Sequence, residues 1–216
     1  PTGAANVLSA ASDFAFAGPQ PGISGQLALP GSDQTMNSLT ASASGITQLT
    51  AIITNSSSTP ATLTLGGAGQ ITTFNGLLAG PINFVLSGIG SVLTMGSANT
   101  YSGSTAVNQG TLALVGSASI SQSPLIMVGD TLDVSGLTSP FILQNSQTLT
   151  NKGASTGFIN GNVSTSNGTV SVSYASGTPA FTIANGTLTL DPLSTFHINN
   201  TGAQLAVGSY KIMATN

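Results

Sequence analysis

Charged residues are almost missing from this chain of 216 residues. Lys and Arg together number two and Asp and Glu five, which makes 3% of the sequence charged, against roughly a quarter in an ordinary soluble domain. The two cations, Lys152 and Lys211, are far apart in sequence and do not form the basic cluster that displaces counterions from a nucleic acid. We therefore expect no nucleic-acid partner, and solubility that depends on hydroxyl and amide side chains.

Cysteine is also absent, which excludes disulfides, zinc–thiolate sites and thiol catalysis. Packing and backbone hydrogen bonds must then hold the fold. The candidate for a membrane span is the uncharged stretch at residues 76–96, but it contains Pro81, Asn83 and five glycines, which argue against a membrane-spanning helix. We predict no membrane span. Because the chain opens on Pro1 without a charged and apolar leader, we expect that a signal peptide has already been removed.

The apolar residues that are present alternate with polar ones. This period of two, with many β-branched residues, is typical of half-buried strands, and it occurs at Thr62–Leu65, Thr111–Leu114, Thr169–Ser173 and Thr187–Leu190. No window has the apolar stripe of an amphipathic helix. The runs are separated by residues that accept turn conformations, namely Gly66–Gly67, Gly88–Gly90, Asn108–Gly110, Ser166–Gly168 and Asn185–Gly186. The sequence predicts an all-β chain with almost no helix.

A short motif of the form Gly/Asn-Thr-Leu-x-Leu/Val recurs along the chain at irregular spacing. It occurs at Ala61–Leu65, Gly110–Leu114, Gly129–Val134 and Gly186–Leu190. Internal repetition distinguishes a solenoid from a sandwich or a barrel, since each repeat stacks its apolar residues on those of its neighbours. At roughly 20 to 25 residues per coil, the chain would form about nine coils.

One segment resembles a known family. Ala98–Gly103, with the sequence Ala-Asn-Thr-Tyr-Ser-Gly, is followed by Thr105–Leu112, and together they resemble the autotransporter-associated β-strand repeat. Ser104 stands where the family usually has a second glycine, and Ser91–Met95 replaces its usual first strand. The resemblance implies a right-handed parallel β-helix (β-solenoid) on the outside of a bacterial cell, with a structural or adhesive role.

We therefore predict a single solenoid domain over residues 31–216, with its repeat core at residues 88–116. Residues 1–30 are interpreted as an N-terminal cap, an exchanged strand or a linker, since Gly18–Gly22 is rich in proline. The leading functional hypothesis is a secreted, non-catalytic structural protein that assembles through its coil ends into a filament or surface coat. The alternative is an adhesin passenger domain that binds glycans or host surfaces.

Few residues are candidates for chemistry, and we predict no catalytic, cofactor-binding or metal-binding residue. His197, the single histidine, lies in an alternating run that should turn it outward, into solvent. Asp130 and Asp133 are the closest pair of carboxylates, as sugar hydrolysis would need, but their spacing on a strand should point them to opposite faces. An enzyme on a β-helix is the third and weakest hypothesis, because the chain has no Arg.

Three further features have structural interpretations. Tyr101, in the repeat core, is expected to pack over the end of a coil rather than to hold a ligand. Outward Thr62, Thr64, Thr187 and Thr189 raise the possibility of an ice-binding threonine ladder, but the irregular spacing argues against a regular one. Gly66–Gly69 lacks the aspartate that follows glycines in calcium-binding repeats.

Overall fold

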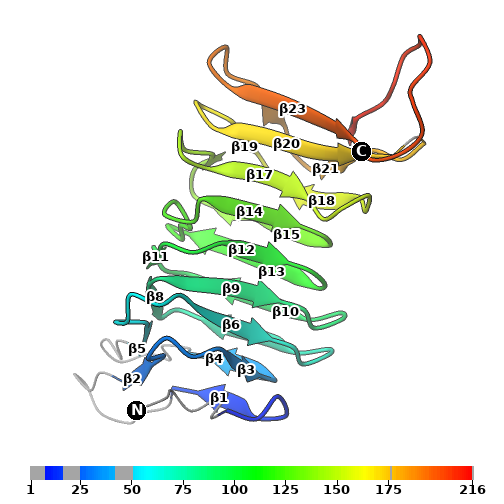
Figure 1. Ribbon diagram of the computed structural model, residues 1–216. Helices are drawn as coiled ribbons and strands as arrows, with labels where there is room; N and C mark the ends of the chain where they lie inside the picture. Colours follow the sequence, from blue (N-terminus) through cyan, green and yellow to red (C-terminus); the bar gives the residue numbers. More distant parts are fainter. Residues whose placement is uncertain (1–7, 17–24, 42–50, 176, 216) are drawn as a thin grey trace.

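The chain forms a right-handed solenoid of parallel β-strands, seen in a computed structural model that describes residues 8–16, 25–41, 51–175 and 177–215. All described regular structure is strand, and every strand pair is parallel. The coils are stacked along one axis from β1 near the N-terminus to β23 near the C-terminus (Figure 1). The predicted fold class is confirmed, including the near absence of helix in the described residues.

The strands make three faces. The first face has two sheets. One consists of β2 (Gly25–Ala28), β5 (Ala51–Thr54), β8 (Leu77–Gly80) and β11 (Thr100–Tyr101). The other consists of β16 (Phe141–Ile142), β19 (Val163–Ser164) and β22 (Leu188–Thr189). The second face is one sheet of eight, β3 (Gln34–Met36), β6 (Ala61–Leu65), β9 (Ile82–Leu86), β12 (Thr105–Val107), β14 (Leu125–Val128), β17 (Thr148–Asn151), β20 (Thr169–Tyr174), β23 (Thr195–Asn200).

The third face begins with the small sheet of β1 (Asp13–Ala15) and β4 (Ser38–Thr40). A bridge from Ala41 to Phe74 joins it to the main sheet. That sheet is β7 (Ile71–Phe74), β10 (Val92–Met95), β13 (Thr111–Gly116), β15 (Thr131–Leu137), β18 (Gly157–Asn160), β21 (Phe181–Ala184), β24 (Met213–Thr215).

Inward side chains stack in rows along the axis. One row of the second face pairs, coil by coil, Gln34, Leu63, Phe84, Thr105, Ile126, Leu149, Val170 and Phe196. From Gln34 to Val170 every member of this row is 2% exposed or less. The period-two pattern of the sequence thus becomes a continuous apolar core, since each coil covers the inward residues of the coil before it.

The number of residues in a coil varies along the solenoid. Leu78 and Asn99, hydrogen-bonded between adjacent coils, are 21 residues apart, whereas Thr62 and Asp33 are 29 apart. The longest sheet has eight strands, so the described chain makes fewer coils than the roughly nine expected from repeat length alone. The repeat core at residues 88–116 contains β10 to β13, which amounts to one pass around all three faces.

Buried amides at the turns join successive coils where other proteins use ion pairs. Asn55 is 2% exposed, and its Nδ2 donates to the carbonyls of Thr59 and Pro81. Asn151 Nδ2 donates to three carbonyls, and its Oδ1 accepts from the amide of Ser173. Each amide satisfies backbone groups in two coils, and buried polar groups that are fully hydrogen-bonded stabilise a core.

The first coil is covered by the segment that precedes it. Leu8 N donates to the side chain of Gln34, and Phe14 packs against the core. Asp13 accepts hydrogen bonds from Ser38 Oγ at 2.5 Å and Asn37 Nδ2 at 2.7 Å, and these bonds lower the pKa of its carboxyl. Both β1 and β2, which precede residue 31, pair in register with solenoid strands. Gly18–Gly22 lies outside the described residues.

The close stacking of coils predicts different costs for two glycines that both have positive φ. At Gly80 (φ 84°) a Cβ would lie 2.1 Å from the carbonyl oxygen of Asn55, whereas at Gly90 (φ 66°) it would meet nothing within 4 Å. We expect Gly90→Ala to cost about 1 kcal/mol from backbone strain alone. Gly80→Ala should cost at least about 3 kcal/mol, since the coils must also separate.

Urea unfolding of both variants, followed by circular dichroism, measures this difference. Equal midpoint shifts for the two variants would contradict the close approach of coils at Gly80.

Candidate functional site

The C-terminal coil leaves its inward side chains open. Phe196 and Ile198 pair in register with Val170 and Val172, which are both fully buried. Phe196 is nevertheless 39% and Ile198 48% exposed, because no described strand lies on the far side of β23. The row that forms the core therefore continues to this end of the solenoid, where it meets solvent.

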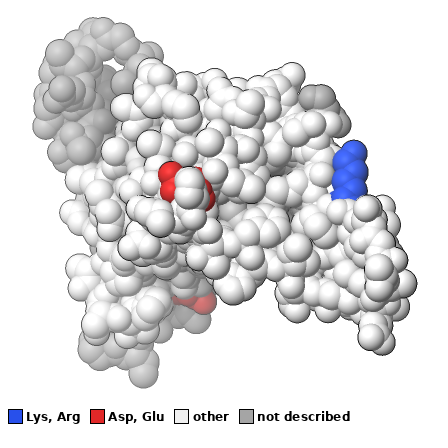
Figure 2. Space-filling model, turned by 90° about the horizontal axis from the view of Figure 1, so that it is seen from above, with Lys and Arg blue, Asp and Glu red and all other residues white. Residues whose placement is uncertain are grey.

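Further exposed apolar side chains lie beside β23, and few charged residues are near it. Leu190 and Leu193, in the turn that leads into β23, are exposed as well. Figure 2 looks onto this end of the molecule, which is white apart from small red and blue areas. Single exposed apolar residues are ordinary, but a group of them along an unpaired strand edge is typical of an interaction surface.

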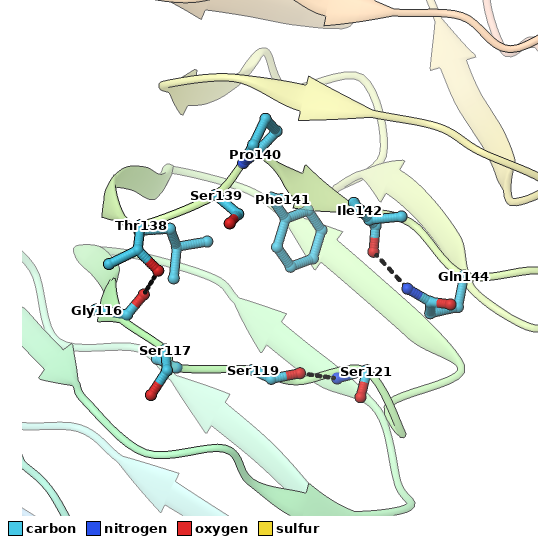
Figure 3. Close-up of a pocket in the computed structure, with 12 residues that line it drawn as sticks. Gly116, Ser117, Ser119, Ser121, Thr138, Ser139, Pro140, Phe141, Ile142 and Gln144 are labelled. Carbon is cyan, nitrogen blue, oxygen red and sulfur yellow. Dashed lines mark hydrogen bonds between the residues drawn. The ribbon is translucent and has the colours of Figure 1, made fainter.

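A second candidate site is a groove in the first face, with a volume of about 300 Å³. It lies between the coil that contains Ser117–Ser121 and the next coil, at Leu137–Gln144. Figure 3 shows Phe141 between the two walls, with serine and threonine side chains around it. Phe141 is 6% exposed, so only an edge of its ring is open to the groove. A smaller groove of about 190 Å³ shares Leu137–Pro140 as one wall.

The structure gives Asp130 and Asp133 separate structural partners. Asp130 precedes β15 and accepts from the amide of Gly110 at 2.7 Å. Asp133 lies within β15 on the outer side, and its Oδ1 accepts from the amide and hydroxyl of Ser135 and from Asn160 Nδ2. Each carboxylate is thus part of the hydrogen bonding between neighbouring coils, and neither lines the two grooves.

His197 faces outward, as the alternation predicts. It pairs with Ser171 and lies between the inward residues Phe196 and Ile198. In the described part of the chain, no group of three or more His, Asp or Glu residues is placed to hold a metal ion. Within residues 8–16, 25–41, 51–175 and 177–215, no helix is long and apolar enough to cross a membrane.

Tyr101 is a core residue, which confirms the packing interpretation. Its side chain is 1% exposed, and its ring lies 6.5 Å from that of Phe84. Its hydroxyl is 2.5 Å from Thr105 Oγ1, which donates to Ser123 Oγ. This buried chain of hydroxyls satisfies the polar Thr105 in an otherwise apolar row, and burial raises the pKa of the Tyr101 phenol.

The outer rows do not form a threonine ladder. Thr64 pairs with Val85, which pairs with Ala106 and then Met127 on the next coils. An ice-binding surface needs one residue type repeated at one spacing, so the expectation against a regular ladder is confirmed.

The sequence analysis did not predict which residues form either candidate surface. The groove is made by residues from separate coils, and no sequence motif indicates that they are neighbours. Comparison with known proteins adds no further candidate, because no family model, curated protein or solved structure matches the chain. The likeness to the autotransporter-associated repeat stays a prediction.

The buried phenol of Tyr101 should make the protein less stable at alkaline pH. Its folded-state pKa lies above the ordinary value near 10, so the unfolded chain releases this proton first, and the stability falls as the pH rises above about 10. Tyr101→Phe removes this contribution. We expect the variant to cost about 1 kcal/mol at neutral pH, and less at pH 11. Urea unfolding at both values tests this, and a difference that is the same at both would contradict it.

Proposed function

We propose that this chain is a non-catalytic, extracellular structural protein that associates with copies of itself through its coil ends, forming a filament or surface coat. The observation that supports the proposal is the exposure of Phe196 and Ile198 at positions where every earlier coil buries its side chains. The resemblance of the repeat core to repeats of bacterial surface proteins supports the location outside the cell.

The physical gain comes from completing the core row at this end. Covering an exposed Phe or Ile contributes about 1.5–3 kcal/mol each, and pairing the free edge of β23 satisfies its backbone groups. Few charges lie on the faces that would meet, so little repulsion opposes contact. In a filament, the C-terminal coil of one copy meets the first coil of the next, where no described strand pairs with the outer edges of β1 and β2.

The proposal of a non-catalytic role is supported by the carboxylates. Asp130 and Asp133 are bound to turn and strand groups of neighbouring coils, and a pair for sugar hydrolysis must instead face one substrate from two sides. We expect Asp133→Asn to lose stability, through its bonds to Ser135 and Asn160, rather than to abolish the turnover of any polysaccharide.

Two lysine substitutions on the same strand test the assembly surface. Ile198→Lys places a charge in the open core row, whereas His197→Lys places the same charge on the outer face. We expect the purified protein to form ordered filaments or sheets in electron micrographs, Ile198→Lys to abolish them, and His197→Lys to retain them. Isolated rods from the unmodified chain, or equal effects of the two variants, would contradict assembly through this coil.

A single cysteine distinguishes two ways of joining copies, since the chain has none of its own. In a head-to-tail filament, cysteines in place of His197 on successive copies lie a whole solenoid apart, so mild oxidation should give no disulfide-linked dimer. If two C-terminal coils instead met across a two-fold axis, His197→Cys would give covalent dimers. Dimers on a non-reducing gel would overturn the filament geometry.

A further inference from the structure

The groove of about 300 Å³ arises from an interruption in the first face of the solenoid. The sheet that begins at β2 ends at β11, and the next sheet begins at β16. Between them, residues 118–120 are joined to the coil below only by the bridge from Ala98 to Ser119, while Phe141 and Ile142 pair with the coil above. The second and third faces continue through this level, so two coils stay stacked there but separate along one side.

Two features set the coils apart at this level. The pairing of β13 with β15 changes register between Ala113 and Val115, and such irregularities redirect a strand. The side chain of Gln147, 1% exposed, joins the two coils beside this level, donating to the carbonyls of Ile120 and Ser123. The groove is therefore flanked by a buried amide that links its two walls.

The lining has one chemical character throughout. Among the twelve residues that line the groove, none is charged, and hydroxyl and amide groups stand beside apolar carbon. The apolar part is the ring of Phe141 together with Ile142, Leu137 and Ala118, and the polar part is Ser117, Ser119, Ser121, Thr138, Ser139 and Gln144 (Figure 3). A site of this kind cannot compensate an ionic ligand, because a desolvated charge needs an opposite charge or strong dipoles.

The walls of the groove are fixed in position by hydrogen bonds. Thr138 donates from its amide at 2.9 Å and its Oγ1 at 3.1 Å to the carbonyl of Gly116. Ser119 Oγ accepts from the amide of Ser121, and Gln144 Nε2 donates to the carbonyl of Ile142. A site whose walls are already ordered loses little entropy on binding. The hydroxyls of Ser117 and Ser139 make no hydrogen bond within the described residues and face solvent.

We propose that this groove binds a neutral saccharide. A sugar ring has an apolar face of C–H groups, which would lie mainly on Ile142, 47% exposed, with the accessible edge of Phe141 beside it. Its rim of hydroxyls would exchange hydrogen bonds with Ser117, Ser139 and Gln144. The volume of about 300 Å³ is at the lower end of small-molecule sites, roughly 300 to 1,000 Å³, which suits a single sugar unit or two. The smaller groove across Leu137–Pro140 extends the surface for a longer chain.

The binding site is independent of the proposed assembly through β23. The groove lies on the side of the solenoid, and its wall at Leu137–Gln144 is two coils away from Phe196. An Ile198→Lys protein that no longer assembles should therefore bind the saccharide as the unmodified protein does, so failure of one proposal is distinguishable from failure of the other.

The test is calorimetric titration with neutral tetrasaccharides of glucose, galactose, mannose and N-acetylglucosamine, and with tetragalacturonate as the charged control. Ser139→Trp fills the groove from an exposed position, and Ser146→Trp, exposed in the same coil but outside both grooves, is the matched control. We expect at least one neutral tetrasaccharide to bind, Ser139→Trp to weaken binding about tenfold or more, and Ser146→Trp to leave it unchanged.

Three results would overturn the proposal. These are no binding of any neutral tetrasaccharide at millimolar concentration, equal affinity in the Ser139→Trp and unmodified proteins, or binding of tetragalacturonate alone. Circular dichroism of each variant confirms that the fold is retained. If Ser139→Trp fails to fold, loss of binding in Ser117→Trp, on the opposite wall, carries the same meaning.

Discussion

The structure depends on one constraint, which is that each coil must lie directly on its neighbour so that backbone groups and inward side chains meet at the same height. The row from Leu63 through Phe84 to Val170 satisfies it with apolar residues. Where a polar residue enters the row, as at Thr105, a buried partner is present. Since interior coils pair on both sides, the molecule needs neither disulfides nor ion pairs, and a chain with 3% charged residues forms an extended core.

The same constraint determines how much could be predicted from the sequence. Alternation identified β6, β13 and β20, and the turn residues include four with positive φ, Gly90, Gly110, Ser166 and Asn185. The outward position of His197 also followed from alternation. These features are local, because each depends on the identity of one or two neighbouring residues. The run at Thr187–Leu190 was less well predicted: only Leu188–Thr189 is strand, and Leu190 is exposed. No described strand covers this coil on its far side.

The two candidate sites could not be predicted because they depend on the relation between coils. Coil length differs by several residues from one turn to the next, and nothing in the residues of Ser117–Ser121 or Leu137–Gln144 indicates that they face each other across a gap. The buried Gln147 beside the groove is a polar residue whose role is defined by its two carbonyl partners in the preceding coil. The structural role of Asp133 likewise depends on another coil, because Asn160 from that coil donates a hydrogen bond to its carboxylate.

The interruption between β11 and β16 also has a mechanical meaning. Over most of the described coils a pull along the axis is resisted by hydrogen-bonded ladders on three sides at once. At this level two sides bear the load, and the third is joined by the amide of Gln147. Tension applied to the ends would therefore concentrate at the level of residues 118–142 and open the molecule there as a hinge before any coil elsewhere separates. In a fibre under shear, this level would yield first, and the stretches on either side would stay intact.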